Sequence, residues 1–436
     1  MRRALALVLI NVAVFLVLAE LLGLLIFYED TGHLFYLHRR TYEAIGDSGE
    51  RRLTTDGLHP YFGPTHAPGT PFDIPDSLRD PPSAPARRQT NNFGFVSSFD
   101  YPFVKTRDNQ FIIGITGGSV GAWFCQVGVS RLIEDLKAQP YFRSRDIVPL
   151  CLAHEGYKQP QQLLLLSYFL SLGQTFDLVV NIDGFNEVAL GSLNEQRGID
   201  SSMPSVMHLE PLINLVDRAT LTSDKLESLT AIETYKARVN RLAGRLKTNR
   251  LASLDVVFDR LYRSARASYQ TESGRFSNLP SNPSTTSLIM ATRPIRTRAP
   301  STVFEAVARA WVNASLSMHA LLAARGTPYV HVVQPNQYYT TRQFGSDEAK
   351  VALSDASPFK AGAAQGYPVL LAAAESARLA QTMAFFDGTH IFDREPAAVY
   401  IDDCCHYTLR GNHLLADFIA NGVLAAPGPW RSSPAK

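Results

Sequence analysis

The chain has 436 residues, 45% hydrophobic and 19% charged, so most of it is expected to fold, as an enzyme-sized domain with attachments. Its 42 basic and 40 acidic residues leave a formal net charge of +2. This near-balance argues against a dedicated nucleic-acid binder, because phosphate neutralisation needs a basic excess. Four cysteines, with no Cys-x-x-Cys pair among them, argue against a disulfide-dense scaffold and a structural zinc site.

The N-terminus predicts a membrane anchor, residues 1–30. Its apolar run, residues 4–27, matches the roughly 20 residues that cross a bilayer as a helix, and no small-residue cleavage site follows it. We therefore favour an uncleaved anchor over a signal peptide or a buried core helix. Arg2 and Arg3 precede the run and acids follow it, which places the rest of the chain on the periplasmic or extracellular side of the inner (cytoplasmic) membrane. Glu20, inside the run, needs a partner or sits protonated near the outer face.

Residues 31–90 are expected to form a proline-rich linker. Eight of the 26 prolines fall between Pro60 and Pro85, so neither a helix nor a central strand can run through that segment. We expect a linker that becomes a surface strap on the folded domain.

Strand and helix patterns alternate in the two segments 91–190 and 301–426, which predicts parallel βαβ units and an α/β domain. The expected strands cover residues 110–116, 146–152, 176–182, 328–333 and, as a short final strand, 398–401. The expected helices cover residues 119–138, 161–172, 302–324, 368–383 and 411–424. Such sheets bind ligands at the carboxyl ends of their strands.

The insertion between these segments, residues 191–300, has two amphipathic helical patterns and is expected to form a helical hairpin. Residues 236–275 contain ten basic and three acidic residues. Arg238, Arg241 and Arg245 share one helix face, opposite the apolar stripe. This face is either simply solvated, or it contacts an anionic membrane surface or glycan.

The ends of the first three expected strands carry candidate catalytic residues. Ser119 follows Gly117 and Gly118 at the start of a helix, where backbone N–H groups and the helix dipole would stabilise the oxyanion of an acyl transfer. The alternative is a serine that only caps its helix. Asn186 and Gly156 follow the other two strands. They are either oxyanion donors or an ordinary loop asparagine and turn glycine.

An Asp-Asp-Cys-Cys-His sequence ending at His406 precedes the closing helix. Asp403, three residues before His406, can orient the imidazole and leave its other nitrogen to accept a proton from serine. The alternative is a surface aspartate and a satisfied histidine. Asp402 does not have the spacing that we expect for this role. His390, three residues after Asp387, is a rival base, although we favour a role for it in stabilising a loop.

The order of these residues resembles the SGNH (GDSL-type) hydrolase superfamily, in a membrane-anchored bacterial branch. The resemblance covers residues 91–190 and 301–426 and implies a three-layer, flavodoxin-like parallel sheet. It implies Ser119 as nucleophile, Asp403 and His406 as the other triad members, and an oxyanion hole made by Asn186 and the backbone N–H groups of Ser119 and Gly156. Gly118 stands where the family usually has aspartate, and the usual asparagine is absent from the segment before Gly156.

The cysteines leave several pairings open. Cys404 and Cys405 are adjacent and rarely bond each other without strain. One of them could pair with Cys125 or Cys151 in an oxidising compartment, or both could be free, buried thiols.

The sequence thus favours a membrane-anchored serine esterase that acts on O-acyl groups of envelope glycans or on lipid esters and needs no metal or cofactor. One alternative is an O-acyltransferase with the same triad. The other is a non-catalytic envelope assembly protein whose insertion, residues 191–300, binds a partner.

Overall fold

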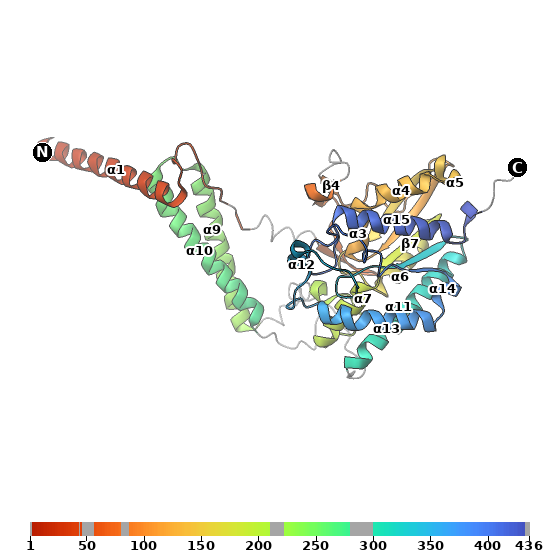
Figure 1. Cartoon of the computed structure of the whole chain (residues 1–436). Coiled ribbons are helices and arrows are strands. Elements are labelled where there is room, and N and C mark those ends of the chain that lie inside the picture. Colours follow the sequence, from red (N-terminus) through yellow and green to blue (C-terminus); the bar gives the residue numbers. More distant parts are fainter. Residues whose placement is uncertain are drawn as a thin grey trace. The chain divides into compact units, whose positions relative to one another are not determined.

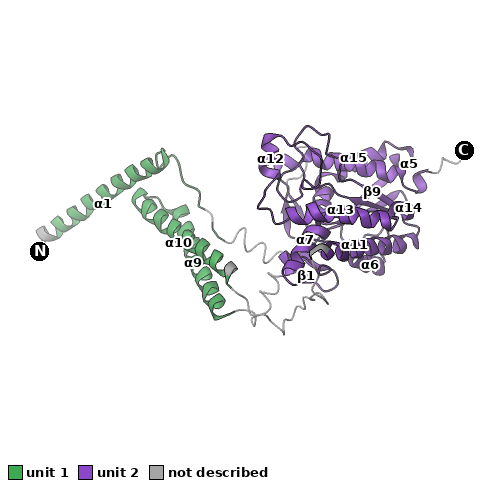
Figure 2. Ribbon diagram, turned by 60° about the horizontal axis from the view of Figure 1, so that its bottom comes forward, with its two compact units in different colours: residues 1–54, 214–289 green, residues 55–213, 290–436 purple. Residues whose placement is uncertain are grey.

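The computed structural model divides the chain into two compact units (Figure 2). The anchor unit comprises residues 1–54 and 214–289, and the α/β unit comprises residues 55–213 and 290–436. The structure describes residues 2–42, 44–45, 56–79, 87–209, 222–279 and 300–431. Parts of the expected linker (46–55 and 80–86) and of the expected insertion (210–221 and 280–299) lie outside the described residues.

A five-stranded parallel sheet forms the centre of the α/β unit, as the alternating pattern predicts. Its strands are β5 (Gln110–Gly117), β6 (Asp146–Ala153), β7 (Leu178–Asp183), β8 (Tyr329–Val333) and β9 (Ala384–Asp387). They lie in the order β6-β5-β7-β8-β9, which is the 2-1-3-4-5 order of flavodoxin-like sheets. Every residue of β5, β7 and β8 is buried, as expected for parallel strands with both faces covered.

Two groups of helices cover the sheet (Figure 1). One group consists of α3 (Ser119–Val127), α4 (Val129–Lys137) and α15 (Leu409–Ala425). The other consists of α6 (Gln161–Ser171), α7 (Phe185–Gln196), α11 (Pro300–Ala323) and α13 (Lys360–Ser376). The shorter helices are α5 (Pro140–Arg143), α12 (Ser346–Ala352) and α14 (Leu379–Thr382), with 3-10 turns at Asp76–Leu78 and Pro429–Arg431. The chain leaves β5 for β6 on one side and then crosses to β7 on the other, so a crevice is expected at the carboxyl ends of β5 and β7.

The last strand is not where the sequence pattern places it. We expected residues 398–401 to form it, but the edge strand is β9, and the expected helix over residues 368–383 is divided between α13 and α14. Tyr400 instead forms a single bridge with Tyr407. The backbone amides in residues 398–401 make hydrogen bonds outside the sheet. Those of Val399 and Tyr400 donate to Glu348, and that of Ile401 donates to the carbonyl of His406.

Part of the expected linker forms two small hairpins on the α/β unit. The hairpins pair β1 (Asp56–His59) with β2 (Gly63–His66) and β3 (Pro71–Asp73) with β4 (Arg87–Gln89), and we call residues 56–79 and 87–90 the strap. Phe62 of the strap is 1% exposed and lies against Tyr168 and Phe169 of α6. The Tyr157 hydroxyl donates to the carbonyl of Pro64 at 2.7 Å.

The expected helical hairpin is present in the anchor unit as α9 (Ser223–Thr248) and α10 (Ala252–Asn278). Buried Val239, Leu242 and Leu246 of α9 form its apolar face, and α10 packs against α1 (Arg2–Thr31). Although residues 191–300 interrupt the α/β domain in sequence, this hairpin groups with the anchor in space.

Helix α1 is long and apolar enough to cross a membrane, judged by length and composition over Leu5–Thr31. Glu20 of α1 has the partner that its position demands. Its carboxylate accepts from the backbone amides of Ala252 and Ser253 at 2.7 and 3.1 Å and from the Ser253 hydroxyl at 2.7 Å. Glu20 therefore caps the N-terminus of α10.

Candidate active site

Ser119 is the first residue of α3, directly after β5, and is 8% exposed. Gly117 has a φ of +152°, and a Cβ there would lie 2.3 Å from the carbonyl oxygen of Ile182. A Cβ on Gly118 would lie 2.1 Å from Nδ2 of Asn186. The two glycines therefore allow the Ser119 turn to lie close to the end of β7 and to Asn186.

The structure corrects the partner of His406. Nδ1 of His406 lies 2.5 Å from Oδ2 of Asp402, whereas Asp403, which we expected in this role, makes no side-chain hydrogen bond with the described residues. The cause is a tight turn. Oδ1 of Asp402 accepts from the backbone amides of Cys404, Cys405 and His406 at 3.0, 3.1 and 3.2 Å, which curls the chain and returns the imidazole to the same carboxylate. Because residues 402–406 carry the candidate base, we call them the catalytic turn.

The carboxyl of Asp402 is held in its ionised form, which can accept a hydrogen bond from Nδ1 of His406. Burial opposes ionisation of its carboxyl, but the hydrogen bonds and charge of His406, together with the backbone amides, outweigh burial and hold its pKa below the ordinary value. The Nδ1 atom of His406 therefore donates to a carboxylate, and whenever the imidazole is neutral its Nε2 atom carries the lone pair.

The catalytic turn lies against Ser119. Oγ of Ser119 is 3.8 Å from Sγ of Cys405 in the same turn. Nε2 of His406 is buried and has no hydrogen-bond partner among the described residues, so it is available to accept a proton. Ser119 thus contacts the turn that carries the His406–Asp402 pair, but no hydrogen bond joins Ser119 to His406, and such bonds are often long before a substrate is present.

The two expected oxyanion residues have different surroundings. Nδ2 of Asn186 donates to the carbonyl of Tyr157 at 2.8 Å and lies beside Gly118, next to Ser119. Gly156 has a φ of +73°, and a Cβ there would lie 2.5 Å from Nε2 of His208. Asn186 is thus placed at the Ser119 turn, while Gly156 belongs to the neighbouring turn, which faces His208.

The loop after β8 supports the catalytic turn through its backbone carbonyls. The side-chain amides of Gln337 and Asn336 each donate at 3.0 Å, to the carbonyls of Asp402 and Cys404. The Tyr338 hydroxyl donates to the carbonyl of Asp403 at 2.9 Å. From the sequence, this loop could be recognised only as the end of a strand. These supporting hydrogen bonds were therefore not predicted, and no pattern of residues indicates them.

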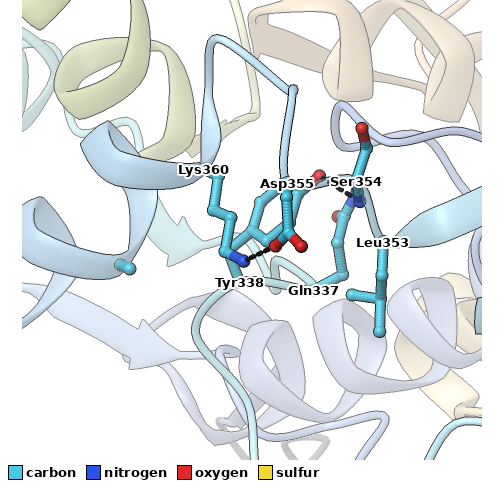
Figure 3. A pocket seen from close by; sticks show the side chains of 7 residues that line it. Gln337, Tyr338, Leu353, Ser354, Asp355 and Lys360 are labelled. Atoms are coloured by element: carbon cyan, nitrogen blue, oxygen red, sulfur yellow. Dashed lines mark hydrogen bonds and ion pairs between the residues drawn. The ribbon is translucent and has the colours of Figure 1, made fainter.

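A cavity of about 380 Å³ adjoins the same loop (Figure 3). Its lining residues are Gln337, Tyr338, Leu353, Ser354, Asp355, Lys360 and Ala364. Nζ of Lys360 and Oδ1 of Asp355 form an ion pair at 2.6 Å across it. Gln337 and Tyr338 thus line the cavity and also hold the catalytic turn.

The rival base His390 has another partner. Its Nδ1 lies 2.8 Å from Asp393, and its side chain is 51% exposed. Asp387, the aspartate that precedes it by three residues, bonds Thr389. This arrangement is that of a loop contact and agrees with our preference for His406.

A second Ser-His-Asp series lies inside the core and was not expected. His331 on β8 is 2.7 Å from Ser315 Oγ on one side and 2.7 Å from Asp183 Oδ1 on the other. Ser315 and His331 are 0% exposed and Asp183 is 2% exposed. No substrate can reach this serine, so burial identifies the series as a structural network.

The structure also settles the cysteine pairing. Cys125 of α3 and Cys151 of β6 form a disulfide, and Cys404 and Cys405 are free. Burial, with Cys404 as neighbour, raises the pKa of the Cys405 thiol well above its ordinary value. A protonated thiol is a poor nucleophile, which leaves Ser119 as the candidate.

No protein-family model matches the chain, and no curated protein matches it.

Proposed function

We propose that this chain is a membrane-anchored serine ester hydrolase of the SGNH type. The observation that carries the proposal is Ser119 at a strand-to-helix turn, against a turn in which His406 is bonded to Asp402. The 2-1-3-4-5 strand order agrees with the three-layer fold that the resemblance implies. O-acyl groups of envelope glycans or lipids are the proposed substrates.

In the proposed reaction, Nε2 of His406 takes the proton of Ser119 as Oγ bonds to the ester carbonyl carbon. The oxyanion accepts from the Ser119 backbone N–H and the Asn186 amide, with the Gly156 N–H as the third expected donor. The leaving alkoxide takes the proton from His406, and an acyl-Ser119 ester remains. Water then attacks that ester with His406 again as base, the bond between the acyl carbon and Ser119 Oγ breaks as His406 returns the proton to Oγ, and the carboxylic acid leaves. If a sugar hydroxyl replaces water, the same steps give acyl transfer.

A fluorophosphonate probe tests the function directly. The full chain in detergent should be labelled at Ser119 and should hydrolyse an aryl acetate, and Ser119→Ala should lose labelling and several orders of magnitude in kcat. Ser315→Ala is the matched control, because the second serine of the Ser-His-Asp type is buried and should keep both signals. Near-normal turnover by a folded Ser119→Ala protein would show that Ser119 is not the nucleophile, and no labelling or turnover by the wild type would leave the scaffold alternative.

We further propose that α1 is retained as an anchor and that the α/β unit lies outside the cytoplasm. The contacts of Glu20 with α10 would be lost if α1 were removed by cleavage. The Cys125–Cys151 disulfide fits an oxidising compartment. An alkaline-phosphatase fusion after residue 100 should be active, whereas an inactive fusion would reverse the orientation.

The basic face of α9 is proposed to meet anionic headgroups. Arg238, Arg241 and Arg245 are exposed, opposite the buried stripe. About 20 residues of α1 cross the bilayer from Ala4, so Glu20 and the hairpin end that it caps lie at the outer surface. At about 1.5 Å per residue, Arg245 then lies closest to the headgroups and Arg238 about 10 Å further away.

This geometry predicts a graded effect. The full chain is placed in nanodiscs of neutral or anionic lipid, and hydrogen exchange of α9 is measured. Anionic lipid should protect the last turns of α9, and the protection should fall at 1 M salt, where the Debye length is about 3 Å. Arg245→Gln should weaken the protection most and Arg238→Gln least, because attraction decays with distance. Equal protection on both lipids would leave a solvated face.

A further inference from the structure

A second cluster of functional side chains lies outside the Ser119 site, where the strap meets the turn after β6. It contains His66, the last residue of β2, and His154 and Glu155, which directly follow β6. Each offers a ligand atom, and these atoms all lie within 4.8 Å of one another. We propose that these three residues bind a divalent transition-metal ion of the zinc class.

The distances between the ligand atoms are close to those in a metal site, so only a small inward movement of the three side chains would be needed to bind an ion. Nε2 of His66 lies 3.2 Å from Oε2 of Glu155. In a tetrahedral zinc site with bonds of about 2.0–2.2 Å, neighbouring ligand atoms are about 3.3 Å apart. The rings of His66 and His154 lie against each other, with centroids 4.4 Å apart. Two imidazoles and one carboxylate are a ligand set that favours zinc over magnesium or calcium.

The environment of His154 independently points to a ligand. The residue is 2% exposed, and its Nε2 atom is buried with no hydrogen-bond partner among the described residues. Its Nδ1 atom lies 2.9 Å from the backbone carbonyl of Glu155, to which it can donate, and 3.6 Å from Oε2 of the same residue. Metal-binding histidines typically donate their other ring nitrogen to a carbonyl or carboxylate, which fixes the tautomer and leaves the free nitrogen for the metal.

His208 is the candidate fourth ligand. Its ring centroid lies 5.9 Å from that of His154. The Cα of Gly156 is also close to it, since a Cβ there would reach within 2.5 Å of His208 Nε2. A metal held here would join the strap to the turn of residues 154–157. That turn ends at Tyr157, whose carbonyl holds the Asn186 amide, so the metal would act as a structural clamp beside the Ser119 site.

Zinc binding to the full chain in detergent tests the proposal after chelator treatment. The free thiols of Cys404 and Cys405, with His406, form another group that can bind a metal, so the measurement uses a Cys404→Ser, Cys405→Ser background. In that background we compare His66→Gln and His154→Gln. His59→Gln is the matched control, because His59 belongs to the same strap but stacks on Phe62.

The expected result is one zinc per chain, bound at least tenfold more weakly in His66→Gln and His154→Gln and equally in His59→Gln. At 100-fold excess over Kd, zinc should raise the Tm by about 5 °C or more, except in the two weakened variants. Cobalt should give tetrahedral visible bands without sulfur-to-metal charge transfer. The side chain of His66 is on the surface strap, so it can be replaced without unfolding the core. Unchanged zinc affinity in His66→Gln would therefore overturn the proposal. So would zinc binding that disappears with the two thiols.

Discussion

Replacing Asp402 by asparagine distinguishes the observed pairing from the one that residue spacing suggests. Oδ1 of Asp402 accepts from three backbone amides, and only an oxygen can occupy that position. In Asp402→Asn, the new NH₂ group must therefore replace Oδ2, 2.5 Å from Nδ1 of His406. Because NH₂ is a donor, it forces Nδ1 to be the acceptor and puts the ring proton on Nε2. That nitrogen can then no longer take a proton from Ser119.

The expected cost follows from this tautomer change. An equivalent aspartate-to-asparagine change in a serine triad lowers kcat by about 10⁴-fold, or about 5 kcal/mol in the activation free energy. Asp403→Asn should stay within about threefold of wild type, because the residue serves the turn through its backbone carbonyl, which the substitution retains.

The assay is aryl-acetate hydrolysis and fluorophosphonate labelling by the full chain, with Tm as the folding control. Asp402→Asn should slow both reactions without a matching loss of Tm. Equal losses in the two variants, or a larger loss in Asp403→Asn, would refute the assignment of Asp402.

Three further variants probe the surroundings of the site and the anchor. Asn186→Ala should lower kcat by about 10²–10³-fold with little change in KM, and an unchanged kcat would remove Asn186 from the oxyanion hole. Burial and the charge of Asp183 raise the pKa of Glu187 to about 8, so the protonated form of this carboxyl stabilises the folded state. This contribution to the free energy of unfolding is complete below pH 4.5 and is lost as pH rises to about 8. In Glu187→Gln, the slope of the free energy of unfolding against pH should therefore be smaller by about 1.4 kcal/mol per pH unit in that window. Parallel pH profiles for the variant and the wild type would contradict this prediction. Glu20→Leu should speed amide exchange in the first turn of α10 by roughly fivefold, as loss of a cap worth about 1 kcal/mol implies, and unchanged exchange would deny the cap.

The central sheet could be predicted from the sequence because its strands are continuous apolar runs, each followed by a helix with a distinct apolar face. Ser119 and Asn186 could be predicted for the same reason: each directly follows such a strand, and neighbouring parallel strands end at one edge. The edge strand β9 could not, because it has four residues, none of them buried, and its signal is no stronger than that of residues 398–401.

The prediction that Asp403 is the hydrogen-bond partner of His406 was wrong for a different reason. Spacing along the chain favours the aspartate three residues before His406, but the structure decides by hydrogen bonding in three dimensions. The amides of residues 404–406 converge on one carboxylate, and this convergence depends on φ and ψ values that the residue types alone do not specify. The contact between His66 and Glu155 is similarly hidden, because 89 positions of sequence separate its partners.

Substrate binding and catalysis are expected to be linked through the loop after β8. Gln337 and Tyr338 line the 380 Å³ cavity and also donate to the carbonyls of Asp402 and Asp403. A ligand group in the cavity that displaces either side chain must loosen the turn that holds His406, while one that packs against both must tighten it. In the proposed enzyme, the cavity would therefore act on the position of the base as well as on affinity. It follows that substrates differing only in the part that fills the cavity should differ in kcat and not in KM alone, because the binding energy of a remote group is then used to align His406 with Ser119.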